Sequence, residues 1–198
     1  MSFLTIALMS AQLSSCAAPD LTQGPAPGDR IAYDLNGFNV ANEIEAADQG
    51  VVRYRQVSIM PGGGPQPPVI MHTSAAGLLV TAIDPPSGPG MTFDVDPAML
   101  VERVAGLTSG ESVRLTTTLT APQPSGGLQS RTAEIEITLL GCGQEQTPGG
   151  VFDVAVFEVV QSSGGAPSVS EVAWAPALGW PVRSSSGGAI LSYTGAGS

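Results

Sequence analysis

The chain contains no lysine, and its seven basic residues are all arginines. Against them stand 17 acidic residues, so the formal net charge is −10 in a chain of 198 residues of which only 12% are charged. Nucleic acids and anionic membrane surfaces are bound by clustered cations. The composition therefore predicts no nucleic-acid partner and no charge-driven contact with a membrane surface.

Histidine is almost absent as well. The single histidine, His72, lies in the apolar run Val69–Thr73, where we expect a half-buried position on a sheet. One histidine cannot form a His-based zinc site without cysteine or carboxylate partners at suitable spacing, and no such spacing is found. The pentapeptide GLTSG at 106–110 carries its serine one place away from that of a G-x-S-x-G elbow. We therefore predict no catalytic residue, no cofactor and no metal ligand.

Two acidic pairs leave weak alternatives to that view. Asp94 and Asp96 lie on one side of an extended segment and could contact a cation, but Asp96 is better explained as a helix cap. Glu134 and Glu136 could act as the acidic pair of a hydrolase, yet they are more simply the solvated face of a strand. An enzyme is therefore the least favoured class.

Long apolar runs are also lacking, and the clearest one is short. Phe3–Leu13 has eleven apolar-leaning residues, too few to cross a bilayer but suited to the apolar core of a signal peptide. The sequence Leu13-Ser14-Ser15-Cys16 that ends it resembles a bacterial lipobox, in which cleavage precedes a cysteine that is then lipidated. The resemblance implies a signal peptide at residues 1–15 and a lipid anchor on Cys16.

The residues around this motif refine the expected location. Ala17 follows the cysteine in place of aspartate, so the usual inner-membrane retention signal is missing. We expect a lipid-anchored protein on the periplasmic face of the outer membrane. Met1-Ser2 supplies no Lys or Arg, so either the start lies upstream or the signal is weak. The alternative is a buried N-terminal helix with an ordinary cysteine. If Cys16 is lipidated, Cys142 is left unpaired, and a buried structural thiol is expected there, with an intermolecular disulfide or a reactive thiol as the alternatives.

Glycine and proline are plentiful, at 25 and 17 residues. Many short strands tolerate such a composition better than helices do. Residues 16–29, which are rich in both, indicate a flexible tether, and residues 30–198 indicate a single β-rich domain. The predicted strands are Arg30–Leu35, Val51–Met60, Val69–Thr73, Leu78–Ile83, Ser112–Thr120, Arg131–Leu140, Val151–Val160 and Val169–Trp174.

Two short helices are predicted among these strands. Val40–Asp48 suits a helix with Asn39 as its cap, and Asp96 with Pro97 begins a clearer one that runs to Gly106. Along Val151–Val160 the acidic residues do not share one face. That pattern favours a strand covered on both sides, or a bulge near Val156.

Two corners carry the densest pattern. The first is TPGG at 147–150, and the second is AWAPALGWPVR at 173–183. The residues expected to hold the corners are Pro148, Gly149, Gly150, Trp174, Pro176, Gly179 and Trp180. Both corners resemble those of uncharacterised secreted bacterial proteins with PAGTF-like and W-Y-A-P-x-L-G-like corners, broadly similar in shape to periplasmic lipoprotein carriers. The resemblance implies a mainly β fold, a curved antiparallel sheet that forms an open half-barrel or a β-barrel-like structure.

Three functions follow, in order of preference. The first is a non-enzymatic envelope lipoprotein that binds an apolar ligand or an envelope protein. The second is a scaffold or assembly factor of the cell envelope, and the third is a hydrolase. The ligand groove is expected along the inward faces of two alternating strands, at Val113, Leu115, Ile135 and Ile137. A concave apolar cavity would favour ligand binding, and a filled one would favour the scaffold.

Overall fold

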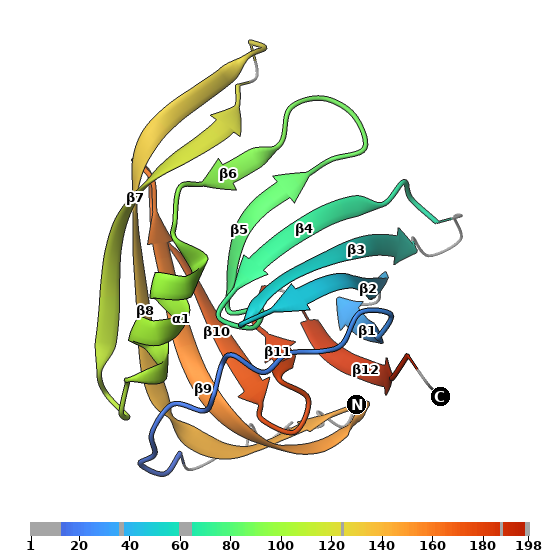
Figure 1. The fold of residues 1–198 in the computed structure, drawn as a ribbon, viewed down its shortest axis with the longest axis vertical. Coiled ribbons are helices and arrows are strands. Elements are labelled where there is room, and N and C mark those ends of the chain that lie inside the picture. The colour runs from blue at the N-terminus through green and yellow to red at the C-terminus, as the bar shows by residue number, and fades with distance from the viewer. Residues whose placement is uncertain (1–12, 36–37, 60–64, 124, 187, 197–198) are drawn as a thin grey trace, which may run out of the picture.

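The structure is a computed structural model that describes residues 13–35, 38–59, 65–123, 125–186 and 188–196. These residues form one antiparallel sheet closed into a barrel, with one helix (Figure 1). Around the barrel the strands follow the chain order, and β12 returns to pair with β1. The elements are β1 (Arg30–Leu35), β2 (Phe38–Asp48), β3 (Val51–Ile59), β4 (Val69–Ser74), β5 (Leu79–Asp84), β6 (Met91–Phe93), α1 (Pro97–Ala105), β7 (Ser112–Pro122), β8 (Leu128–Thr147), β9 (Gly150–Ser162), β10 (Ser168–Ala175), β11 (Trp180–Ser184) and β12 (Gly188–Thr194).

The predicted fold class is confirmed, and the structure decides between its two forms. Pairing of β1 with β12, from Arg30 opposite Thr194 to Asp34 opposite Ala189, closes the sheet into a barrel. An open half-barrel would leave the backbone groups of those two strands unpaired at free edges. The barrel-like alternative is therefore the one the chain adopts.

The predicted strands fall within observed ones except at two ends: Leu78 lies in the turn before β5, and Met60 lies outside the described residues. Of the two alternatives for β9, cover on both sides is confirmed, and the bulge near Val156 lies in the neighbouring strand β8. An extra residue in β8, Leu140, forms a bulge opposite Val156 and Phe157. Val156 packs in one core cluster and Phe157 in the other, so both faces of β9 are covered.

One predicted helix is wrong. Val40–Asp48 belongs to β2, and Asn39 pairs with Ile59 of β3 instead of capping a helix. Val40, Asn42 and Ile44 alternate as buried positions, which is the period of a strand. The polar Asn42 interrupts the apolar stripe and conceals that period in the sequence.

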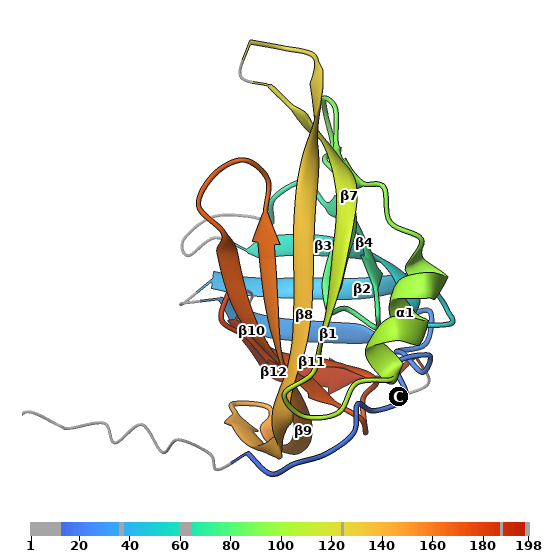
Figure 2. The same ribbon diagram turned by 90° about the vertical axis from the view of Figure 1, so that its left-hand side faces the viewer.

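The second predicted helix, α1, is confirmed. The side chain of Asp96 accepts hydrogen bonds from the backbone N–H groups of Ala98 and Met99, at 3.0 and 3.3 Å. Leu100 and Val104 are fully buried in the larger core cluster, with side chains of β7 to β10. Figure 2 shows α1 beside β7 at one end of the barrel. The helix therefore fills that end of the interior.

Residues 16–29 are not a flexible tether. Leu21 is fully buried in the core, and the backbone N–H of Ala18 donates to Leu107 O at 2.8 Å. Pro and Gly in this segment produce an irregular path, and the buried Leu21 fixes that path to the barrel. Most of the predicted signal segment, residues 1–12, lies outside the described residues. Within the described part of the chain, no helix is long and apolar enough to cross a membrane.

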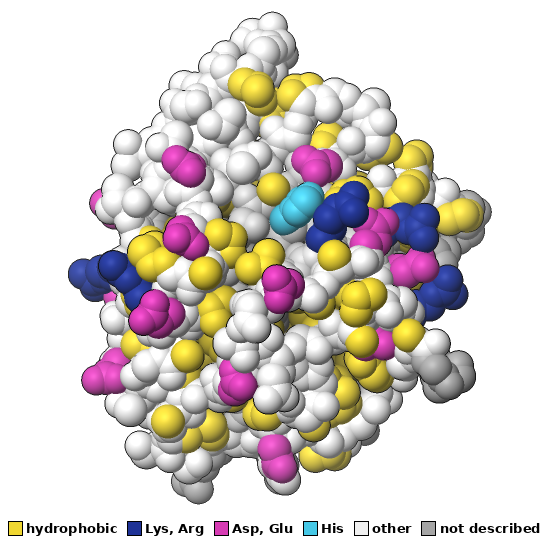
Figure 3. Space-filling model, viewed as in Figure 1, with side chains coloured by type: hydrophobic (Ala, Val, Ile, Leu, Met, Phe, Trp, Pro, Cys, Tyr) yellow, Lys and Arg dark blue, Asp and Glu magenta, His cyan; other side chains and the backbone are white. Residues whose placement is uncertain are grey.

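Charged side chains on β1 to β5 pair with one another. Arg55 lies 2.6 Å from Glu43, and Arg53 lies 2.8 Å from Glu45. The histidine occupies the half-buried sheet position that was predicted, and its Nε2 lies 3.0 Å from Asp84 Oδ2. Figure 3 shows the histidine on this face of the molecule with arginine and acidic side chains close by. The arginines of β1 to β3 are thus each paired with a glutamate.

Candidate ligand cavity

The barrel contains a cavity of about 410 Å³ beside the volume filled by α1. Its walls are made by inward-facing residues at alternate positions of nine strands, β1 to β6 and β9 to β11. Small-molecule sites in proteins typically measure about 300–1,000 Å³. The cavity is therefore large enough to hold part of a small ligand.

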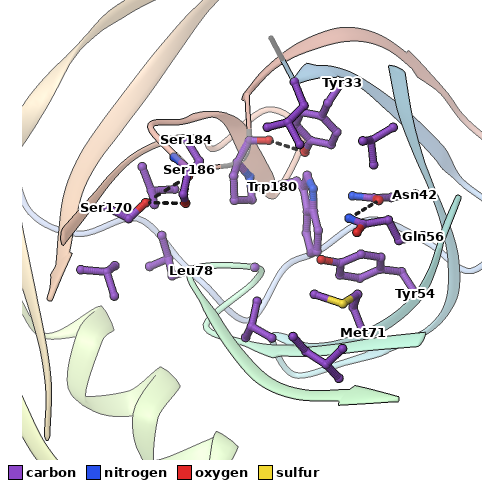
Figure 4. Close-up of a pocket in the computed structure, with 18 of the residues that line it drawn as sticks. Tyr33, Asn42, Tyr54, Gln56, Met71, Leu78, Ser170, Trp180, Ser184 and Ser186 are labelled. Carbon is purple, nitrogen blue, oxygen red and sulfur yellow. Dashed lines mark hydrogen bonds between the residues drawn. The ribbon is translucent and has the colours of Figure 1, made fainter. Parts of the chain in front are cut away.

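Aromatic side chains form one wall of the cavity. Trp180 lies between Tyr33 and Tyr54 (Figure 4), and its ring meets that of Tyr54 edge-on, with centroids 5.6 Å apart. The hydroxyl of Tyr33 donates to Pro181 O at 2.7 Å. Burial raises the pKa of both tyrosines above the ordinary value, so both hydroxyls are neutral near pH 7. This wall offers flat apolar surface without charge.

The turn between β4 and β5 brings backbone against this aromatic wall. At Gly77, a Cβ atom would lie 2.9 Å from Pro181 Cδ and 3.0 Å from the Trp180 ring. Gly77 also has φ +91°, a conformation that side chains disfavour. Glycine therefore permits the turn to enter the barrel, and Leu78 beside it lines the cavity.

Polar side chains lie on two other sides of the cavity (Figure 4). Gln56 Nε2 donates to Asn42 Oδ1 at 3.2 Å. The hydroxyls of Ser170, Ser184 and Ser186 form a triangle with edges of 2.9 to 3.1 Å. These groups can exchange hydrogen bonds with a ligand and carry no net charge.

No charged residue lines this cavity among the residues that the structure describes. Transfer of an ionised group into such surroundings without a partner is costly. The cavity therefore suits an uncharged, largely apolar group with some capacity for hydrogen bonds.

The four residues predicted to line a groove lie elsewhere. Ile135 and Ile137 are fully buried, Leu115 is 8% exposed, and all three pack in the core that contains Leu100 of α1. Val113 packs against the same core. The inward face of these two strands is therefore part of the packed core and does not line the cavity.

The residues that do line the cavity were missed for a physical reason. Asn42, Gln56 and Ser58 occupy inward positions on β2 and β3, and their polar side chains interrupt the apolar alternation that marks an inward face in a sequence. The series Tyr54, Gln56 and Ser58 is a signal that the sequence does contain. These residues lie two positions apart, so they share the inward face of β3 with polar side chains on it.

The two acidic pairs lie apart from the cavity. Asp96 caps α1, and Asp94 accepts a hydrogen bond through its backbone carbonyl from Thr117 Oγ1. Glu136 pairs with Arg114 at 2.9 Å, and neither it nor Glu134 lines the cavity. In the described part of the chain, no group of three or more His, Cys, Asp or Glu side chains is placed to hold a metal ion.

The two cysteines correct the expectation of an unpaired thiol at Cys142. Cys16 and Cys142 form a disulfide, with Cα atoms 5.9 Å apart. Ser14 and Cys142 also pair through their backbones, so residues near the predicted cleavage point lie along β8. A thioether-linked lipid would use the same sulfur of Cys16. Lipidation of Cys16 and this disulfide therefore exclude each other in one molecule.

The residues predicted to hold corners lie in or beside two hairpin turns. In the β8–β9 turn, which consists of Pro148 and Gly149 and leads into Gly150 of β9, Gly149 N–H donates to Ile190 O of β12 at 2.9 Å. In the β10–β11 turn, Gly179 N–H donates to Pro176 O at 3.3 Å. The tryptophans that flank this second turn are both buried. Trp174 Nε1 donates to Ala76 O at 3.0 Å, which ties β10 to the turn between β4 and β5.

The fold has a counterpart among solved structures. It is similar to the crystal structure of the hypothetical lipoprotein YmcC from Escherichia coli, with a TM-score of 0.54 and 13% sequence identity. The match covers 82% of this chain and 80% of that one. No family model and no curated protein matches the sequence.

Proposed function

We propose that this barrel is a non-enzymatic binding module of the bacterial cell envelope whose interior takes the apolar, uncharged part of a small ligand. The observation that carries the proposal is the cavity of about 410 Å³ with an aromatic wall and no charged lining residue in the described chain. Hydrophobic and aromatic walls with a few polar groups are typical of ligand sites.

The alternatives have less support. A scaffold would be favoured by an interior filled with side chains, whereas here two packed core clusters leave a cavity of about 410 Å³ in the barrel. A hydrolase would need Glu134 and Glu136 near a substrate, and neither lines the cavity. An envelope protein as partner is consistent with the fold, but no described surface argues for one over a small ligand.

An uncharged environment-sensitive dye such as Nile red tests the proposal. The wild-type protein should increase the fluorescence of the dye, and Met71→Trp, which places a large ring in the cavity, should reduce binding at least about tenfold. Ile70→Trp adds the same ring at the neighbouring position of β4, which does not line the cavity, and should leave binding unchanged. Failure of well-folded wild-type protein to bind the dye would favour the scaffold.

We also propose that the mature chain is a lipoprotein that begins at Cys16 and contacts the membrane through its lipid, on the periplasmic face of the outer membrane. The supporting observations are the Leu13-Ser14-Ser15-Cys16 motif, Ala17 after the cysteine, and a fold shared with a hypothetical lipoprotein. On this proposal the disulfide belongs to unprocessed chains, because processing uses the sulfur of Cys16.

Metabolic labelling with a fatty-acid analogue in a bacterial host tests the anchor. The wild type should be labelled, Cys16→Ala should not, and Cys142→Ala should be labelled as the wild type is. The intact mass should also show a free thiol at Cys142 in the mature protein. An unlabelled wild type that retains the Cys16–Cys142 disulfide would reject the lipid anchor.

A further inference from the structure

A second hollow continues the cavity toward the projecting β7–β8 hairpin. It measures about 380 Å³ and lies between β6, β7, β8 and the loop from β9 to β10. Four residues line both hollows: Met91, Phe93, Gln161 and Ser168. The two hollows are therefore adjacent parts of one site.

Arg131 is the one charged residue among the described residues that line the two hollows. It follows the same alternation on β8 as Ala133, Ile135 and Ile137, which are buried inside the barrel, so it lies on the inner face beyond the apolar stripe. Its partner in the ladder is Leu119, which also lines the second hollow. Arg131 is exposed to solvent and lines the second hollow but not the first.

No acidic side chain balances this arginine. Arg131 takes part in none of the ion pairs found in the described chain, whereas Arg30, Arg53, Arg55, Arg114 and Arg183 each pair with a glutamate. The acidic neighbour on its own strand, Glu134, has the opposite parity and therefore lies on the outer face. The positive charge is available to a ligand.

We propose that the ligand is a single-chain amphiphile, with its apolar part in the barrel interior and an acidic head group bound by Arg131. This inference rests on the proposed binding function and specifies its ligand class. A guanidinium group presents N–H donors in a planar fork that matches carboxylate and phosphate oxygens. Along the site the aromatic wall comes first, then serine and glutamine side chains, and then Arg131. An amphiphile would place its apolar chain against the aromatic wall and its acidic head group at the arginine.

Displacement of Nile red by matched ligands tests the proposal. Dodecanoate and dodecyl phosphate should displace the dye more strongly than dodecanol, each below the concentration at which it forms micelles. Arg131→Gln should weaken both acids about tenfold and leave dodecanol unchanged. Comparison of the two acids identifies the preferred head group.

Arg103→Gln is the matched control, because Arg103 lies on α1, has no ion pair among the described residues and lines neither hollow. It should leave all three affinities unchanged. Equal displacement by acids and alcohol, or equal weakening by Arg103→Gln, would overturn the role of Arg131 while the binding function stands. Absence of Nile red binding in the wild type would instead reject the binding function.

Discussion

Asp29 is a single residue that joins the beginning and the end of the described chain. It is 3% exposed, and its carboxylate accepts hydrogen bonds from the backbone N–H groups of Ala26 and Ala196, both at 2.8 Å, and from the hydroxyl of Tyr193. Burial opposes ionisation of Asp29, but these hydrogen bonds outweigh it and hold its pKa below the ordinary value. Burial and the Asp29 carboxylate together raise the pKa of Tyr193 to about 12.

The lowered pKa of Asp29 gives a prediction with a defined sign. The folded protein binds fewer protons at this site than the unfolded chain, whose aspartate has a pKa of about 3.9. The stabilisation is therefore complete above about pH 4–5 and is lost as the pH falls through the folded-state pKa. Asp29→Asn should reduce the free energy of unfolding by about 1–3 kcal/mol at pH 7, because an amide cannot accept all three hydrogen bonds.

Thermal unfolding as a function of pH measures this effect. The difference between wild type and Asp29→Asn should shrink as the pH falls below the ordinary aspartate pKa of about 3.9. Asp20→Asn changes an exposed carboxylate of the same N-terminal segment and should have a much smaller effect at pH 7. A constant difference across the pH range would show that the charge of Asp29 contributes nothing.

Among the elements, the β10–β11 hairpin depends most on its turn. Gly179 has φ +60°, and a Cβ atom there would lie 2.8 Å from Gln23 O and 3.0 Å from Gly24 Cα. The turn thus packs against residues 16–29, the segment that was predicted to be a flexible tether. Both the backbone conformation and the lack of space require glycine.

Gly179→Val should reduce the free energy of unfolding by about 1–3 kcal/mol through backbone strain. For a domain of this size, each kcal/mol lowers the thermal midpoint by roughly 2–4 °C. Gly165→Val is the control, because that residue lies in an exposed loop where an added Cβ meets nothing within 4 Å. Equal midpoints for the two variants would contradict the strain at Gly179.

For the molecule as a whole, the sequence predicts features that depend on neighbouring residues, but it does not predict which distant segments pair. The strict alternation of β7 and the Asp96-Pro97 start of α1 depend on neighbouring residues, and both were predicted correctly. The pairing of β1 with β12 joins distant segments and leaves no local pattern. The disulfide was missed because the motif around Cys16 assigned its sulfur to a lipid.

The sequence predicted that the sheet would leave an apolar space, but it did not predict where that space lies. Alternating inward residues of a curved sheet were expected to leave an apolar space, and a cavity exists. Its position depends on which half of the interior α1 fills, and that follows from the packing of Leu100 and Val104 against β7 to β10. The sequence identifies the apolar face of α1 but not the half of the barrel it covers.

Closure of the barrel through its first and last strands also constrains how the chain folds. Arg30 pairs with Thr194, so almost the whole domain must be present before this contact can form, and the loop it closes is long. β12 has only two residue pairs with β11, so its place depends mainly on β1. Until β12 docks, the edges of β1 and β11 offer unpaired backbone groups to strands of other chains. Aggregation during biogenesis therefore depends on how quickly the last strand arrives, however stable the finished barrel is.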